Sequence, residues 1–192
     1  MFLLKDVEIV GLARSIKASG MAMMEGDKFP DQYPKSYKKL ASYPPSTGHN
    51  NFLKGIDVYF KVKYPQYWTP QAQRYKFFEI ICSSSKMHRL INSVNTGTMS
   101  FNEYTPEDSI EIVKREVTIY NSLVNEEDRK KQFQVVLSAC PMGLELWMEV
   151  KTNYMQLKTI YLQRRNHKLK EWQIFCNWIE TLPMADELII ST

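Results

Sequence analysis

The sequence predicts one domain of the α+β class over residues 1–192, and three observations carry this prediction. A chain of 192 residues has a normal length for one domain. Hydrophobic residues make up 44% and charged residues 24%, which are ordinary values for a globular protein. Helical spacings dominate the chain, and strand signals are scattered among them without the regular alternation of a doubly wound sheet.

The first 65 residues contain two strand signals and one helix signal. Val7–Val10 is a short apolar run that predicts a strand, and residues 12 to about 24, which lack proline, predict a helix. Prolines punctuate residues 26–50 and predict loops or short helices there. The clearest strand covers residues 56–62 and ends at Pro65. One of its faces is wholly apolar: Ile56, Val58, Phe60 and Val62.

Three helices are predicted in the middle of the chain. Pro70 suits the first position of a helix over residues 71–81, because its missing N–H would be unpaired there anyway. Thr105 can cap the next helix, Pro106 sits in its first turn and acidic residues follow. Residues 126–139 predict the third helix. The apolar positions of the second recur at helical spacing: Ile110, Val113, Val117, Tyr120 and Val124.

The C-terminal third predicts a strand followed by two helices. Apolar residues alternate with Glu145, Trp147 and Glu149 between residues 144 and 150, which indicates a second half-buried strand. Residues 153–165 and 169–181 have helical spacing. The apolar stripe of the last helix is Leu169, Trp172, Cys176 and Ile179.

Composition narrows the class of protein without naming a function. The net charge of +4 is compatible with a phosphate-bearing ligand and modest for a nucleic-acid partner. Cys82, Cys140 and Cys176 are widely spaced, which predicts reduced thiols in a cytoplasmic protein. Glycine-rich phosphate loops, HExxH motifs, cysteine pairs and long apolar runs are missing from the sequence, so neither a metal site nor a membrane span is predicted.

Two clusters of basic residues are candidate binding sites. The first cluster contains Gln71, Arg74 and Lys76, the run of serines that ends at Lys86, and then His88 and Arg89. This pattern suits a phosphate as well as a solvated basic face. The second cluster, residues 164–168, suits either an anionic planar ligand or the compensation of a helix dipole. Tyrosines and lysines over residues 33–76 leave single-stranded nucleic acid as a weaker alternative.

Several of these segments together resemble the flavin-dependent thymidylate synthases. The similarity begins at residues 48–55 and continues through the strand after them. The family's Arg-His-Arg signature, with its later Glu, Ser and Arg, falls on Arg74-Tyr75-Lys76, Cys82, Ser84 and Lys86. Arg74 and Ser84 match it, the two lysines keep its charge, and Tyr75 and Cys82 replace its His and Glu.

The C-terminal half has a similar layout. Pro141, Asn153 and a later arginine look like the family's Pro, Asn and active-site Arg. The spacing from Asn153 favours Arg164 over Arg165 for that arginine. Glu171-Trp172-Gln173-Ile174 looks like the family's Gln-Trp-Glu-Ile.

The resemblance implies helices on a small mixed or antiparallel sheet, a homotetramer, and nucleotide biosynthesis in the cytoplasm. It implies FAD as cofactor, with NADPH and methylenetetrahydrofolate as co-substrates, for methylating or otherwise modifying the base of dUMP or a related pyrimidine deoxynucleotide. A non-catalytic relative that serves as an oligomeric binding protein or scaffold stays open as the alternative.

The resemblance also assigns residues to these ligands. Arg164 would be catalytic, because a guanidinium there can stabilise negative charge on the uracil ring. The implied cofactor-binding residues are His49, Asn51, Arg74, Tyr75, Lys76 and Asn153. The implied nucleotide-binding residues are Gln71, Arg74, Ser84, Ser85, Lys86 and Arg164.

Overall fold

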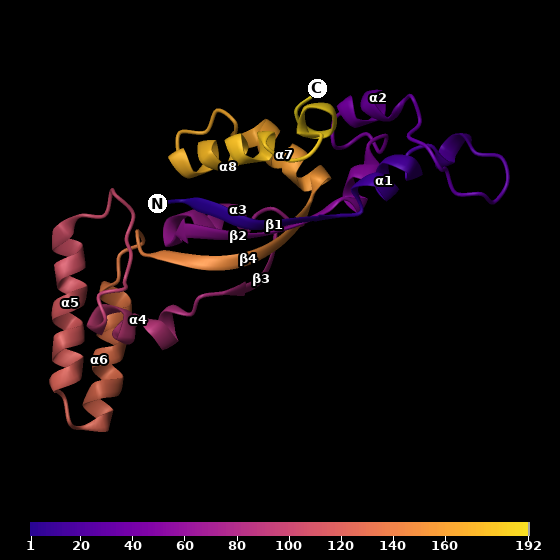
Figure 1. Ribbon diagram of the computed structural model, residues 1–192. Helices are drawn as coiled ribbons and strands as arrows, with labels where there is room; N and C mark the ends of the chain where they lie inside the picture. Colours follow the sequence, from indigo (N-terminus) through magenta and orange to yellow (C-terminus); the bar gives the residue numbers. More distant parts are fainter. Residues whose placement is uncertain (192) are drawn as a thin grey trace. The chain divides into compact units, whose positions relative to one another are not determined.

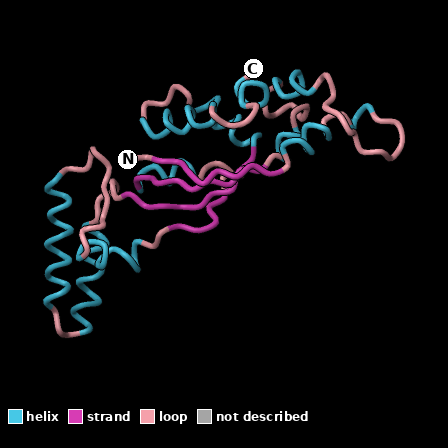
Figure 2. The backbone as a smooth tube through the Cα atoms, in the orientation of Figure 1, coloured by secondary structure: helices cyan, strands magenta, loops and turns pink. Residues whose placement is uncertain are grey.

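A computed structural model describes residues 1–191 and shows the predicted α+β class (Figure 1). Its strands form a small four-stranded antiparallel sheet in the order β1-β2-β4-β3 (Figure 2). The strands are β1 (Leu3–Val10), β2 (Asp57–Pro65), β3 (Glu79–Ser83) and β4 (Glu145–Asn153).

Helices of different lengths connect these strands and follow the last of them. The α-helices are α1 (Leu12–Ala18), α2 (Tyr37–Ser42), α3 (Thr69–Ala72), α4 (Lys86–Asn95), α5 (Glu107–Ser122), α6 (Glu126–Ala139), α7 (Tyr154–Arg164) and α8 (Lys170–Glu180). Shorter helical turns are η1 (Met21–Met23), η2 (Asn51–Gly55), η3 (Gln66–Trp68) and η4 (Asp186–Ile190).

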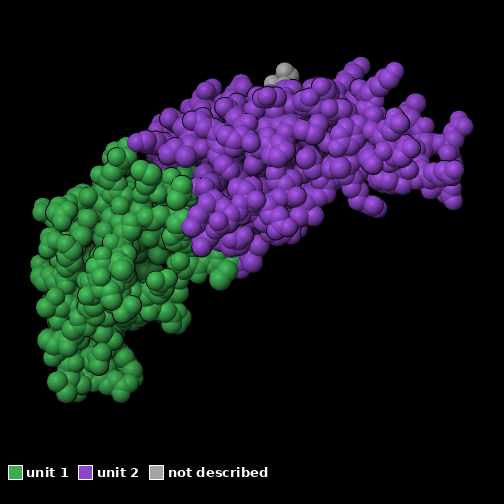
Figure 3. Space-filling model, in the orientation of Figure 1, with its two compact units in different colours: residues 1–3, 63–71, 82–148 green, residues 4–62, 72–81, 149–192 purple. Residues whose placement is uncertain are grey.

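The chain divides into two compact units, which Figure 3 colours separately. Unit 1 contains residues 1–3, 63–71 and 82–148, and unit 2 contains residues 4–62, 72–81 and those from 149 onward. Each unit is therefore assembled from segments that are far apart in the sequence. The single domain over 1–192 stays a prediction.

Unit 1 is built around the hairpin of α5 and α6 (Figure 1). Its core contains Leu90, Val113, Val117, Val136, Cys140 and Leu144. The α5 helix carries the predicted stripe from Ile110 to Tyr120, but Val124 lies beyond its end and is 96% exposed. The expected capping residue is also wrong. Thr105 Oγ1 donates to Asn102 Oδ1 at 2.6 Å, and Pro106 occupies the N-cap position without a side-chain hydrogen bond. The predicted α6 bounds are confirmed, and Asn125 caps that helix.

Unit 2 buries the apolar face of β2 under α7 and α8. The four residues predicted to share this face, Ile56, Val58, Phe60 and Val62, are all fully buried. Phe60 lies at the centre of an aromatic cluster, with ring centroids 6.0 Å from Phe78, 5.8 Å from Phe175 and 4.7 Å from Trp178. The period of two in the sequence therefore predicted the buried face correctly.

The predicted helix over residues 71–81 is wrong. After Pro70 the α3 helix lasts only to Ala72, and two tight turns follow, with Tyr75 N donating to Ala72 O and Phe78 N to Tyr75 O. The end of the segment is β3, which lies beside β4 in the sheet. The isoleucines at its centre favour a strand once a partner strand is present.

Cysteine reactivity is expected to follow burial. Cys82 is exposed, whereas burial raises the pKa of the Cys140 thiol and, together with Glu180, raises that of Cys176 to about 12. Because the thiolate is the reactive form, the native protein is expected to react through Cys82 with a chromogenic disulfide reagent near neutral pH. The denatured protein should react through all three. Fast labelling of Cys140 or Cys176 in the native protein would contradict this burial.

Between residues 1 and 191, none of the helices has the length and the apolar run needed to cross a bilayer. The same residues contain no group of three or more histidine, cysteine, aspartate or glutamate side chains arranged to hold a metal ion.

Candidate functional site

A cationic pocket of about 470 Å³ lies in unit 2, and we call it the arginine pocket. Its described lining holds three cations, two amides, two hydroxyl groups and no carboxylate. The lining residues are Arg74, Tyr75, Lys76, Gln156, Thr159, Gln163 and Arg164. Such a set favours an anionic or hydrogen-bonding ligand.

One face of α7 supplies four of these residues, since positions 156, 159, 163 and 164 fall on the same side of a helix. Asn153 caps this helix by accepting from Gln156 N at 2.9 Å. The Gln156 side chain then accepts from Phe77 N at 3.2 Å. These two contacts fasten the loop that carries Arg74, Tyr75 and Lys76 against the start of α7. The buried Asn153 thus already has a structural partner.

Arg164 is held from two sides at the C-terminal end of α7. Its Nε donates to the Tyr75 hydroxyl at 2.7 Å. Its guanidinium carbon lies 4.9 Å from the centroid of the Trp172 ring, within the range of a cation–π interaction. Arg165 is exposed and is not part of the lining. Arg164 is therefore the arginine of this pair that faces the pocket.

A second pocket, of about 290 Å³, lies in unit 1, and we call it the serine pocket. Its polar lining contains Lys63, Ser84, Ser85, Lys86, Arg89, Ser93, Thr98, Ser100 and Glu145. Ser85 caps α4 by accepting from His88 N at 3.2 Å, and Ser84 N donates to Trp147 O at 2.8 Å. The predicted run Ser84, Ser85 and Lys86 thus enters one pocket together with the first turns of α4.

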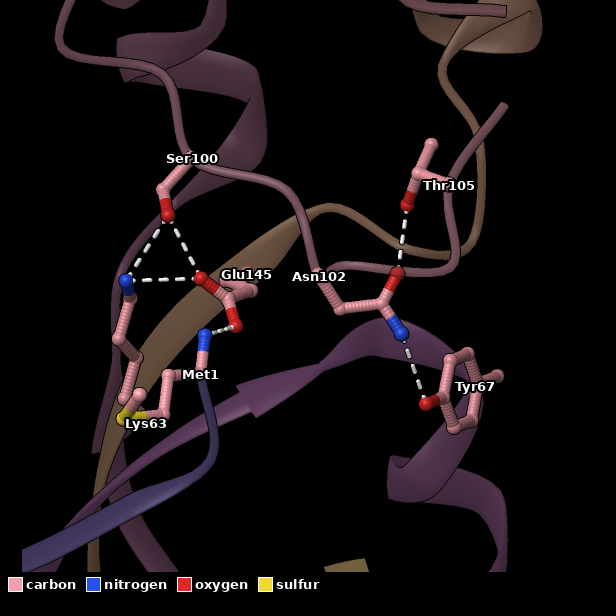
Figure 4. A network of polar contacts seen from close by, with 7 residues as sticks. All are labelled: Met1, Lys63, Tyr67, Ser100, Asn102, Thr105 and Glu145. Carbon is pink, nitrogen blue, oxygen red and sulfur yellow. Dashed lines mark hydrogen bonds and ion pairs between the residues drawn. The ribbon is translucent and has the colours of Figure 1, made fainter. Parts of the chain in front are cut away.

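A buried carboxylate, that of Glu145, belongs to the lining of the serine pocket, and Figure 4 shows its polar contacts. Glu145 Oε2 lies 2.7 Å from Lys63 Nζ and 2.6 Å from Ser100 Oγ, and its other oxygen contacts the amino group of Met1. Burial alone would raise the pKa of Glu145, but these partners lower it below its ordinary value. The side chain is 1% exposed, so its charge is neutralised within the wall.

The remaining predicted residues lie outside the linings of both pockets. Gln71 belongs to unit 1, while His49 and Asn51 belong to unit 2. The ring of His49 packs on Tyr43 at 4.5 Å, and Asn51 is exposed at the start of η2. Their binding roles stay predictions.

Sequence reasoning missed several members of both pockets. In the arginine pocket these are Gln156, Thr159 and Gln163, whose helical spacing on a predicted helix was an available signal. In the serine pocket it is Ser93, which follows Lys86 and the predicted Arg89 on the same face of α4. Lys63 and Glu145 carried no comparable signal, because each belongs to a strand that meets the other only in the fold.

Comparisons with known proteins reveal similarity in structure. A scan against protein-family models finds no match, and neither does a search of curated proteins. Solved structures do match. ThyX from Helicobacter pylori, a flavin-dependent thymidylate synthase complexed with FAD and dUMP, superposes with a TM-score of 0.65 at 13% identity, covering 97% of both chains. A second structure of that protein with FAD and dUMP gives 0.61 at 14% identity, covering 98% of this chain and 95% of the other.

The chain is also similar to PolB from Streptomyces cacaoi, a UMP/dUMP methylase bound with 5-Br dUMP. That match has a TM-score of 0.65 at 14% identity and covers 100% of this chain and 94% of the other. Similarity over nearly the whole length of both chains shows that this protein has the fold of the flavin-dependent thymidylate synthases.

Proposed function

We propose that this protein is a flavin-dependent thymidylate synthase-like enzyme that binds FAD and a pyrimidine deoxynucleotide, dUMP or a close relative. It methylates or otherwise modifies the base. The observation that carries this proposal is the arginine pocket, in which Arg74, Lys76 and Arg164 face one cavity without a carboxylate in its described lining. Two proteins with the same fold bind dUMP or its 5-bromo derivative.

The chemistry of the donors fits both ligands. Cations and amide groups in the arginine pocket suit a pyrophosphate or a uracil ring, and the hydroxyl groups and cations of the serine pocket suit a phosphate. When bound, FAD supplies the redox chemistry, with NADPH and methylenetetrahydrofolate as co-substrates. Arg164 holds positive charge at the uracil ring, where negative charge develops as the base is activated.

The roles of single residues follow the resemblance. Arg74, Tyr75 and Lys76 lie along the cofactor, with His49, Asn51 and Asn153 near it. Gln71, Arg74, Ser84, Ser85 and Lys86 hold the nucleotide. We propose a cytoplasmic homotetramer as the working form. Exposed apolar side chains on the edge strand β1, with Val7 at 41% and Val10 at 46%, support association with further copies.

A non-catalytic relative is the second candidate, and the state of Tyr75 favours it. This residue stands where the resemblance places a cofactor contact, yet its side chain is buried and its hydroxyl already has two partners in the chain. A binding protein that has lost the flavin would keep the fold and the nucleotide pocket.

Purification tests the proposal directly. The protein is expected to be yellow, or to become yellow when FAD is added, with flavin absorption that remains after gel filtration. Titration of dUMP should then perturb the flavin spectrum. Nucleotide binding by a colourless protein that takes up no FAD would support the non-catalytic candidate, and binding of neither ligand would contradict both.

A further inference from the structure

We infer that Tyr75 is a positioning residue that holds the Arg164 guanidinium in one orientation. This inference rests on the proposed function, because it assigns Arg164 to the nucleotide. Its structural basis is the set of contacts that Tyr75 makes with Arg164, Gln163 and Trp172 within unit 2.

The ring of Tyr75 is fixed by burial and by an aromatic neighbour. The residue is 8% exposed, and its ring meets Trp172 edge-on at 5.9 Å with an interplanar angle of 74°. Trp172 is itself fully buried and packs against Phe175 at 5.8 Å. The phenol is therefore carried by a rigid part of the core, and its hydroxyl has a defined position.

The directions of the two hydrogen bonds at this hydroxyl follow from chemistry. A guanidinium has donors only, so the Tyr75 oxygen must accept from Arg164 Nε, at 2.7 Å. The single phenolic proton then points to Gln163 Oε1, at 3.1 Å. Since Gln163 and Arg164 are consecutive residues of α7, the hydroxyl bridges two neighbouring side chains of one helix end.

The hydrogen bond from Arg164 Nε to the Tyr75 hydroxyl, which we call the tether, restricts how Arg164 can contact a ligand. Arg164 Nε donates to Tyr75, and the guanidinium carbon lies over the Trp172 ring at 4.9 Å from its centroid. Rotation of the guanidinium away from this position breaks one contact or the other. Because Nε already donates to Tyr75, a ligand cannot accept hydrogen bonds from Nε and one terminal nitrogen at the same time, which is the side-on mode of arginine binding. An arginine fixed beforehand loses less freedom on binding than a mobile one.

The variant Tyr75→Phe tests this role, because it removes the hydroxyl and keeps the ring. The matched control is Tyr161→Phe, which also removes a hydrogen-bonded hydroxyl from a largely buried tyrosine. Tyr161 belongs to α7, and its hydroxyl donates to Glu180 at 2.7 Å, outside the lining of the arginine pocket. Tyr75→Phe loses the hydrogen bonds to Arg164 and Gln163, and Tyr161→Phe loses the one to Glu180. Of these contacts, only the one between Tyr75 and Arg164 would position the guanidinium.

Two readouts are needed. The first is the Arg164 Nε–H resonance in a spectrum of ¹⁵N-arginine-labelled protein, assigned by its absence in Arg164→Lys. We expect slow proton exchange in the wild type and in Tyr161→Phe, and fast exchange in Tyr75→Phe. The second is dUMP affinity by calorimetry, which should fall about tenfold in Tyr75→Phe and stay unchanged in Tyr161→Phe.

Unchanged exchange in Tyr75→Phe would overturn the tether. Fast exchange with unchanged dUMP affinity would show that the contact exists but positions nothing, and this also overturns the inference. If the wild-type protein binds no dUMP, the proposed function is wrong. The Nε–H exchange then decides the tether alone, independently of any ligand.

Discussion

Replacing Arg164 by alanine is expected to weaken dUMP binding by about ten- to a hundredfold and to abolish turnover, while the fold survives. A hydrogen bond to a charged group contributes about 1.5–3 kcal/mol, and each 1.4 kcal/mol corresponds to a factor of ten in affinity. The free energy of unfolding should fall only slightly, because the cation–π contact with Trp172 contributes about 0.5–1 kcal/mol. Calorimetry with dUMP and a thermal melt measure the two effects separately.

Arg165→Ala is the matched control for this experiment. Both arginines lie at the end of α7 and carry the same charge, but Arg165 is exposed and outside the lining of the arginine pocket. Its replacement should leave dUMP affinity within about a factor of two. An equal loss in both variants would mean that net charge drives binding, and unchanged affinity in Arg164→Ala would mean that the nucleotide binds elsewhere.

The sequence predicted best where one element decides its own structure. The apolar face of β2 followed from a period of two, and α6 has the bounds of the helix predicted over residues 126–139. The segment 71–81 failed because its isoleucines gain from a partner strand, and that partner, β4, starts more than sixty residues later at Glu145. Local propensity carries no information about such a neighbour.

The burial of Glu145 likewise depends on partners that are distant in the sequence. Alternation placed it on the exposed face of its strand, yet it is 6% exposed, because Lys63 and Ser100 supply a countercharge and a hydrogen bond from distant segments. A carboxylate is buried when such partners exist, and the partners are defined only by the fold. The pairing of Lys63 with Glu145 therefore could not be read from either strand alone.

The candidate site contains one residue that the sequence predicted and one contact that it could not predict. Spacing from Asn153 singled out Arg164, and that residue does face the arginine pocket. The contact between Arg164 and Tyr75 joins residues 89 positions apart and carried no signal in the sequence. Motifs thus identify which charges converge, whereas the orientation of each charge depends on packing.

Replacing Phe60 by alanine is expected to lower the free energy of unfolding by about 3–5 kcal/mol, the usual cost of removing a buried aromatic ring. The ring is fully buried and contacts Phe78, Phe175 and Trp178, so its loss leaves a cavity in the centre of the unit 2 core. Chemical denaturation at a fixed protein concentration measures the change.

Tyr59→Ala is the matched control, because Tyr59 is the preceding residue of β2 and its half-buried side chain lies on the opposite face. Its loss should cost about 1 kcal/mol, a typical value for a point mutation. The comparison tests the register of β2 directly, since a shift of one residue would exchange the two faces. If Tyr59→Ala destabilised the protein as strongly as Phe60→Ala, the assignment of Ile56, Val58, Phe60 and Val62 to the core would be wrong. The residues of β2 that pack against α8 would then have to be those of the opposite face.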